Sequence, residues 1–163
     1  MRRKEPLYTK RRYWYHVSTT LRRNELRLTP WDEQKSPNRG TCEPEGARIC
    51  VAPTIEQCIT AIPYYRNSTF TFTVYRTKSP VMAKRPSPTK DIFDWRVTRE
   101  GWLLKPTNFI KIGSIRSSDI RKGEGIDDIC EASASCSTIE ESRDVLRWWQ
   151  ALKLRKRYFH KLI

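Results

Sequence analysis

The 163-residue sequence has few glycines, only two histidines and no long apolar run. With six glycines in all, it contains no phosphate-binding loop, and Gly123-Glu124-Gly125 lacks the flanking pattern of a dinucleotide-binding fingerprint. No G-x-S-x-G sequence is present, which excludes the nucleophile elbow of serine hydrolases. No stretch reaches the roughly 20 apolar residues of a membrane-spanning helix, and the basic opening lacks the apolar segment of a secretory signal. We therefore expect a cytoplasmic protein without a membrane span.

The five cysteines do not form a recognisable disulfide or zinc pattern. Their number is odd, and no secretory signal accompanies them, so a disulfide framework is not expected. Cys42, Cys50 and Cys58 are evenly spaced and lack the close pairs of tetrahedral zinc sites. We expect free thiols in a reducing compartment and no metal.

The sequence is strongly basic, with 32 Lys and Arg against 18 Asp and Glu and a formal net charge of +14. Its 11% aromatic residues are too many for a disordered chain, which favours one folded domain. Nucleic acid is the commonest partner of such a chain, and an acidic protein surface is the next. The alternative is that the charge only keeps the protein soluble.

The basic residues concentrate at the two ends of the sequence. The candidates for binding nucleic acid or another partner are Arg11, Arg12, Arg22, Arg23, Arg155, Lys156 and Arg157. Because both clusters flank a more neutral middle, we expect the charge to select the partner and any chemistry to belong to the middle.

Hydrophobic periodicity predicts an α+β fold with a small, mostly antiparallel split sheet, short helices and a C-terminal amphipathic helix. Strands are expected over residues 13–17, 47–52, 69–75, 102–104 and 110–115. The short connection between the last two predicts that they are antiparallel neighbours. Residues 78–90, rich in Pro and Lys, are expected to form an exposed loop.

Two capping boxes mark expected helix starts. Thr54 with Gln57 predicts a short helix that begins at residue 55 and presents Ile55, Cys58, Ile59 and Ile62 on one face. A second box precedes the C-terminal helix, and the pairs that fit it are Ser137 with Glu140 and Thr138 with Glu141. That helix either docks its tryptophans onto the domain or docks on a partner or nucleic acid.

The expected organisation has four parts. A flexible basic arm covers residues 1–12, and the α+β core covers 13–116. A linker follows over 117–137, and the basic amphipathic helix occupies 138–163.

Four short segments resemble those of small proteins with the ADP-ribosyltransferase fold. They are Tyr15-His16-Val17-Ser18, Leu28-Thr29-Pro30, the run RICVAPT at 48–54 and the run EGWLLKP at 100–106. The nearest types are the rifamycin-modifying and RNA 2′-phosphotransferase branches, with similar small proteins of phages and bacteria. The resemblance spans roughly residues 13–115, so it covers neither the basic arm nor the C-terminal helix.

The resemblance implies an NAD site. His16, as the first-strand histidine, would bond the ribose of NAD, with Ser18 on the same edge. Thr54 would wall the nicotinamide pocket together with Tyr64 or Tyr65. The cofactor would be NAD.

The resemblance also implies a catalytic acid. Glu100, with Asp94 as a substitute, would stabilise the positive charge that develops on the ribose as nicotinamide leaves. The reaction would be transfer of ADP-ribose to a nucleic acid or a nucleic-acid-associated protein. Alternatively, Glu100 is only a turn residue before a strand, and the protein is an inactive relative that keeps the fold alone.

The alternative function is non-enzymatic. A small basic protein of a phage or mobile element could bind nucleic acid or inhibit a host machine that processes nucleic acid. Trp14, Trp31, Trp148 and Trp149 would then offer rings for base stacking. Reversible attachment of residues 143–163 to a membrane surface is a third alternative.

Overall fold

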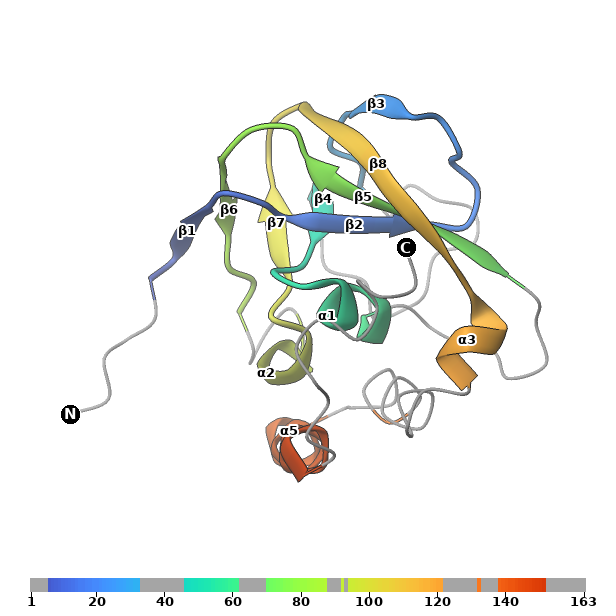
Figure 1. Ribbon diagram of the computed structural model, residues 1–163. Coiled ribbons are helices and arrows are strands. Elements are labelled where there is room, and N and C mark those ends of the chain that lie inside the picture. Colours follow the sequence, from blue (N-terminus) through green and yellow to red (C-terminus); the bar gives the residue numbers. More distant parts are fainter. Residues whose placement is uncertain are drawn as a thin grey trace.

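The structure is a computed structural model that describes residues 6–32, 46–61, 70–87, 92, 94–121, 132 and 138–151. It has the predicted α+β class, with two four-stranded antiparallel sheets and short helices on one side (Figure 1). Sheet A has the strand order β1 (Tyr8–Arg11), β6 (Val81–Lys84), β7 (Gly101–Leu103) and β4 (Ile49–Val51). Sheet B has the order β2 (Tyr15–Ser18), β5 (Thr71–Thr77), β8 (Thr107–Arg116) and β3 (Glu25–Leu28).

The two sheets are joined by the backbone. Tyr15, at the start of β2, exchanges two hydrogen bonds of 2.9 Å with Ala52, which directly follows β4. Trp14 adds a second connection, because its backbone N–H donates to Thr77 of β5 while its indole donates to the carbonyl of Val81 in β6. Sheet A and sheet B are therefore held at a fixed position relative to each other.

The described helices are α1 (Ile55–Thr60), α2 (Trp95–Thr98), α3 (Ser117–Arg121) and α5 (Ile139–Ala151). Helix α1 packs against β2 and α2, and α5 packs against α2 (Figure 1). Thr54 caps α1 by accepting a hydrogen bond from the backbone of Gln57, as its sequence predicts. The second capping box, at the start of α5, is formed by Thr138 and Glu141. Each side chain accepts a hydrogen bond from the backbone N–H of the other residue. Ile62 of the predicted first helix lies outside the described residues.

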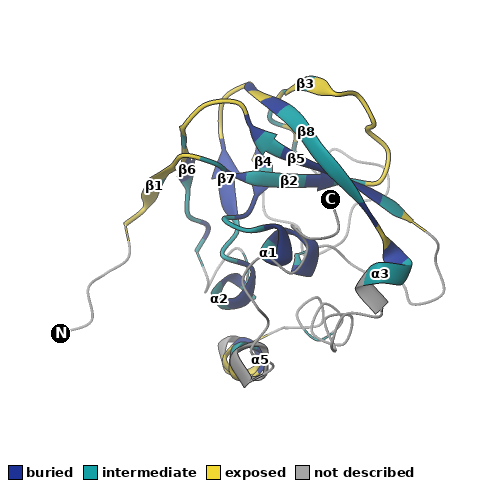
Figure 2. Ribbon diagram, in the orientation of Figure 1, coloured by how far each residue is buried: buried dark blue, intermediate teal, exposed yellow. Residues whose placement is uncertain are grey.

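The apolar core has two parts, one on each face of sheet B (Figure 2). Phe72 and Val74 of β5 face α1 with Ile55 and Ile59, whereas Tyr75 faces sheet A. This is the ordinary alternation of a strand; the register shift between Val74 and Tyr75 leaves Ile112 of β8 unpaired. The strand predicted over 69–75 is present as β5, and both of its faces are buried.

The prediction of a flexible arm over residues 1–12 is wrong for Tyr8–Arg11, which form β1 along β6. Residues 78–90 were expected to form a loop, and this is wrong for Val81–Lys84. Ala83 is 2% exposed and Met82 is 58% exposed, so the alternation of a strand is present between Pro80 and Pro86. Each strand is stabilised by a partner far away in the sequence, which local composition does not reveal.

The prediction that the strands near residues 102–104 and 110–115 are neighbours is also wrong. β7 pairs with β4 and β6 in sheet A, whereas β8 pairs with β5 and β3 in sheet B. The short connection through Pro106 passes from one sheet to the other and does not close a hairpin. The expected linker over 117–137 begins with α3, and most of its other residues lie outside the described part.

Gly101 leaves no room for a side chain, and this gives a test of the packing in sheet A. A Cβ there would lie 2.9 Å from the Cβ of Ala83 and 3.1 Å from the indole ring of Trp14. We expect Gly101→Ala to lower the free energy of unfolding by about 1–3 kcal/mol because the core must shift to admit the methyl group. Urea unfolding measures this, with Met82→Ala on the exposed side of β6 as the control. Equal stability of the two variants would contradict the packing described here.

Candidate functional site

His16 of β2 points toward sheet A. Its Nδ1 lies 2.9 Å from the carbonyl oxygen of Cys50 in β4, and its ring lies 5.9 Å from the ring of Phe109. Because a carbonyl oxygen only accepts, Nδ1 carries the proton in this contact. Burial lowers the pKa of His16, with the Cys50 hydrogen bond opposing the shift in part. At neutral pH the imidazole is therefore uncharged, and its Nε2 is an acceptor.

Glu100 lies between α2 and β7. Arg99, which precedes it, has a left-handed backbone (φ 53°) that ends α2 and turns the chain into β7. The Oε1 atom of Glu100 accepts a hydrogen bond of 2.8 Å from the indole N–H of Trp102. Burial raises the pKa of Glu100, and nearby Asp94 raises it further, whereas hydrogen bonds from Cys50 and Trp102 oppose the shift.

Cys50 connects the two predicted residues. Its carbonyl accepts from His16, and its thiol hydrogen-bonds with the carboxyl group of Glu100. Cys50 also pairs with Trp102 in the register of β4 and β7. We call the cluster of His16, Arg48, Cys50, Glu100 and Trp102 the Cys50 junction. Burial raises the pKa of the Cys50 thiol well above its ordinary range, and Glu100 adds to this effect, so the sulfur is a protonated donor and not a nucleophile.

Arg48 completes the junction. It is only 5% exposed, its guanidinium lies 4.8 Å above the ring of Trp102, and it donates to the carbonyl of Gly46 at 3.1 Å. Arg48 also lies close enough to Glu100 and Cys50 to favour their charged forms. Sequence analysis did not select Arg48, Cys50 or Trp102 as site residues. The alternation over residues 47–52 places Arg48 and Cys50 on the same side of the strand, and this pattern could have identified them as site residues.

The other residues selected from the sequence are not part of this junction. Ser18 accepts hydrogen bonds from the backbone N–H groups of Thr20 and Leu21 and so closes the turn after β2. Thr54 caps α1. Tyr64 and Tyr65 lie outside the described residues.

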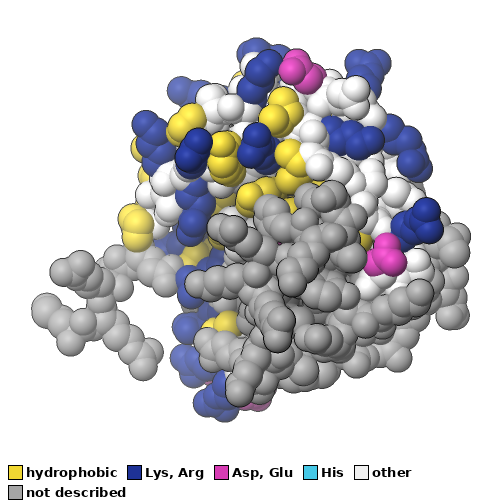
Figure 3. Space-filling view, viewed as in Figure 1, with side chains coloured by type: hydrophobic (Ala, Val, Ile, Leu, Met, Phe, Trp, Pro, Cys, Tyr) yellow, Lys and Arg dark blue, Asp and Glu magenta, His cyan; other side chains and the backbone are white. Residues whose placement is uncertain are grey.

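The basic residues selected at the start of the chain are all exposed, namely Arg11, Arg12, Arg22 and Arg23. Figure 3 shows one face of the molecule. On its described residues, Lys and Arg side chains are widely spread, with few Asp and Glu among them. The basic residues selected near the end of the chain, Arg155, Lys156 and Arg157, lie outside the described residues.

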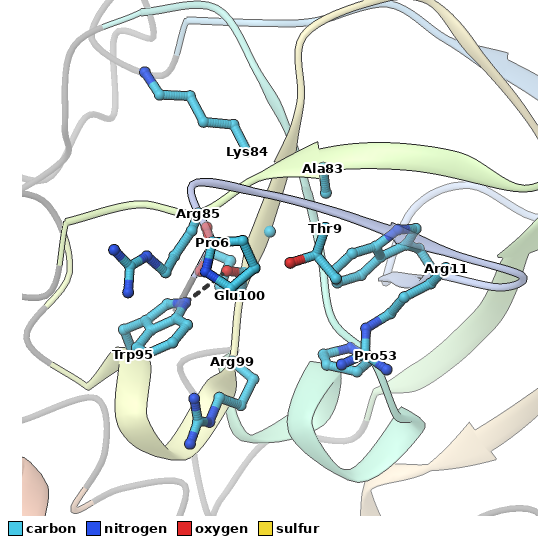
Figure 4. Close-up of a pocket in the computed structure, with 12 residues that line it drawn as sticks. Pro6, Thr9, Arg11, Pro53, Ala83, Lys84, Arg85, Trp95, Arg99 and Glu100 are labelled. Atoms are coloured by element: carbon cyan, nitrogen blue, oxygen red, sulfur yellow. Dashed lines mark hydrogen bonds between the residues drawn. The ribbon is translucent and has the colours of Figure 1, made fainter. Parts of the chain in front are cut away.

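A small cavity of about 80 Å³ adjoins Glu100 on the side of β1 and β6 (Figure 4). Arg11, Arg85 and Arg99 line it together with Trp14 and Trp95. His16 does not line it. The cavity is basic, because Lys84 lines it as well as the three arginines. The cavity is also far below the roughly 300–1,000 Å³ of a pocket that encloses a drug-sized ligand.

Within the described ranges, no three His, Cys, Asp or Glu side chains are grouped as a metal site would need. Cys50 and Cys58, the two cysteines that the structure describes, are free thiols. None of the described helices is long and apolar enough to cross a membrane.

No protein-family model, curated protein or solved structure matches the chain. The resemblance to ADP-ribosyltransferases therefore rests on the residues quoted above, and it stays a prediction.

Glu100 gives a test by pH. A carboxyl group whose pKa is raised on folding makes the folded state less stable as pH rises from its ordinary pKa of 4.5 through the raised value. We expect Glu100→Gln, which keeps an oxygen for the Trp102 indole, to gain stability relative to the wild type across that window and to hold the gain above it. Thermal unfolding from pH 4 to 8 measures the difference between the two proteins. A difference that does not change with pH would show that Glu100 titrates as an ordinary exposed acid.

Proposed function

We propose that the protein is an NAD-dependent ADP-ribosyltransferase with its reaction centre at the Cys50 junction. The observation that carries this proposal is that His16 and Glu100, which come from different sheets, contact the two ends of one residue. The resemblance implies that His16 bonds the ribose of NAD and that Glu100 stabilises the positive charge that develops on this ribose as nicotinamide leaves. Their proximity supports a common site.

His16 suits the binding part of this role. Its Nδ1–H is held by the Cys50 carbonyl, which fixes the ring and leaves Nε2 to accept a hydrogen bond from a ribose hydroxyl. Its lowered pKa keeps the ring neutral at pH 7, so Nε2 stays an acceptor. The Cys50 contact thus acts on the substrate through His16, and Cys50 is a positioning residue.

Glu100 suits the electrostatic part. When bound, NAD supplies a ribose carbon that becomes electron-deficient as the bond to nicotinamide breaks. A carboxylate about 4 Å from such a unit charge stabilises it by on the order of 4 kcal/mol at an effective dielectric constant of about 20. The Trp102 indole and the Cys50 thiol hold the carboxyl group in place and favour its ionised form. The raised pKa means that activity should increase with pH as Glu100 loses its proton.

Transfer of label from NAD tests this proposal. Purified protein is incubated with NAD labelled in its adenylate part and with RNA, DNA or acidic protein as acceptor. We expect Glu100→Gln to lower transfer by about 100-fold or more, because a preorganised charge is lost at the reacting carbon. Glu25→Gln is the matched control, since Glu25 is exposed and, among the described residues, forms an ion pair with Lys78 alone. Wild-type protein that neither transfers label nor is stabilised by NAD would overturn the proposal.

The alternative is a non-enzymatic basic protein that binds nucleic acid or inhibits a machine that processes it. One observation favours it: Trp102 and Cys50 occupy the carboxyl group of Glu100, as they would in a purely structural site. In that case Glu100→Gln changes stability but leaves binding to nucleic acid intact.

A further inference from the structure

Strand β1 lies at the edge of sheet A. Within the described part of the chain it pairs with β6 on one side, and no strand lies on its other side. The pairing with β6 runs from Tyr8 to Arg11 without a register shift. Most of the strand is exposed, and it lies at the outer limit of the described fold (Figures 1 and 2). The free edge of β1 is therefore accessible to a partner.

The backbone of β1 presents donors and acceptors along this edge. The N–H of Arg85 donates to the carbonyl oxygen of Leu7 at 2.7 Å. This contact fixes which residues of β1 bond to β6, because hydrogen-bonded and non-hydrogen-bonded pairs alternate along antiparallel strands. The N–H and C=O groups of Thr9 point toward β6, and those of Tyr8 and Lys10 point to the free side. An edge of this kind is a template for one more strand.

The outer face of β1 and β6 combines apolar and positively charged side chains. Ala83 of β6 belongs to the core, so its neighbours Met82 and Lys84 face outward, as do their partners Lys10 and Tyr8. Tyr8 is 48% exposed and Met82 is 58% exposed. Neither strand contains an acidic residue. The lysines alone would protect the edge from unwanted pairing, whereas the apolar side chains beside them offer a partner surface to bury.

We propose that β1 binds an extended acidic segment of a partner protein, which joins sheet A as a fifth strand. The backbone of the segment would bond to the free groups of Tyr8 and Lys10, as in other cases of β-strand addition. On the outer face, an apolar residue and a carboxylate two positions apart would lie opposite Tyr8 and Lys10. The inference concerns binding alone and holds whether or not the Cys50 junction transfers ADP-ribose.

Charge and backbone chemistry together favour this occupant. Pairing of β1 with β1 of a second copy would bring Lys10 and Arg11 of two chains into one ladder, and like charges in a ladder are destabilising. A nucleic acid strand matches the charge, but its phosphates donate no hydrogen bond to the carbonyl groups of Tyr8 and Lys10. An acidic peptide matches both the charge and the backbone.

Binding of a labelled peptide to the full chain tests the proposal. The probe is a short fluorescent peptide built from the repeat Glu-Thr-Val-Thr, which places Glu and Val alternately on one face, and anisotropy gives Kd. Lys10→Gln removes one positive charge from the edge. Lys10→Pro also removes the N–H that points to the free side, and it spares the bonds to β6. We expect Lys10→Gln to weaken binding by about two- to fivefold and Lys10→Pro to weaken it by about fivefold more.

Matched controls separate charge from backbone pairing. The same peptide N-methylated along its whole length keeps its charge but loses its backbone donors, so we expect binding to be weaker by about tenfold or more. Arg143→Gln removes the same charge from an exposed position of α5 and should change Kd by less than about twofold. Lys10→Glu should bind a Lys-Thr-Val-Thr peptide more tightly than the wild type does, which tests the edge even if Lys10→Pro does not fold.

Amide hydrogen exchange locates the bound peptide. We expect exchange to slow at Tyr8 and Lys10 and to stay unchanged over Glu25–Leu28 of β3, which is the edge of sheet B and contains an acid. Equal binding of the methylated and unmethylated peptides would overturn the proposal, as would protection of β3 without β1. Tighter binding of a single-stranded oligonucleotide, with equal losses in Lys10→Gln and Lys10→Pro, would assign the face to nucleic acid and overturn it as well. So would a dimer of the free protein that Lys10→Pro abolishes, because the occupant would then be a second copy.

Discussion

The two backbone hydrogen bonds between Tyr15 and Ala52 fix the position of sheet B relative to sheet A, and the candidate site depends on them. Side chains alternate along a strand, so when Tyr15 packs against the α1 side of the core, His16 must point to the opposite side. There it meets the carbonyl of Cys50, two residues before Ala52. The thiol of Cys50 in turn meets Glu100 because β4 pairs with β7. A slip of one residue in the Tyr15–Ala52 pairing would turn His16 away and separate it from Glu100.

The Cys50 junction places charged groups where apolar residues would be less costly. Arg48 is nearly fully buried, and burial raises the pKa of Glu100, so both groups oppose folding through loss of hydration. The Trp102 ring under Arg48 and the Trp102 N–H bound to Glu100 offset part of this cost. One tryptophan thus serves both charges, with its face toward the cation and its edge toward the acid.

Local signals in the sequence predicted local structure well. Thr54 with Gln57 and Thr138 with Glu141 marked helix starts because a capping box is complete within four residues. Strands β1, β3 and β6 were not predicted. Each pairs with a strand far away in the sequence, and the prolines and lysines around β1 and β6 resemble those of a loop. His16 and Glu100 were selected through the resemblance, and the structure brings them to the same residue. The basic cavity could not be predicted, because Arg11, Arg85 and Arg99 meet only through the strand order of sheet A.

A basic residue from the start of the chain and residues from its middle line one cavity, although the clustering of Lys and Arg at the chain ends suggested that they would lie apart. Arg11 comes from the basic opening, yet β1 carries it to the same cavity as Glu100. The segments that line this cavity come together only in the folded state.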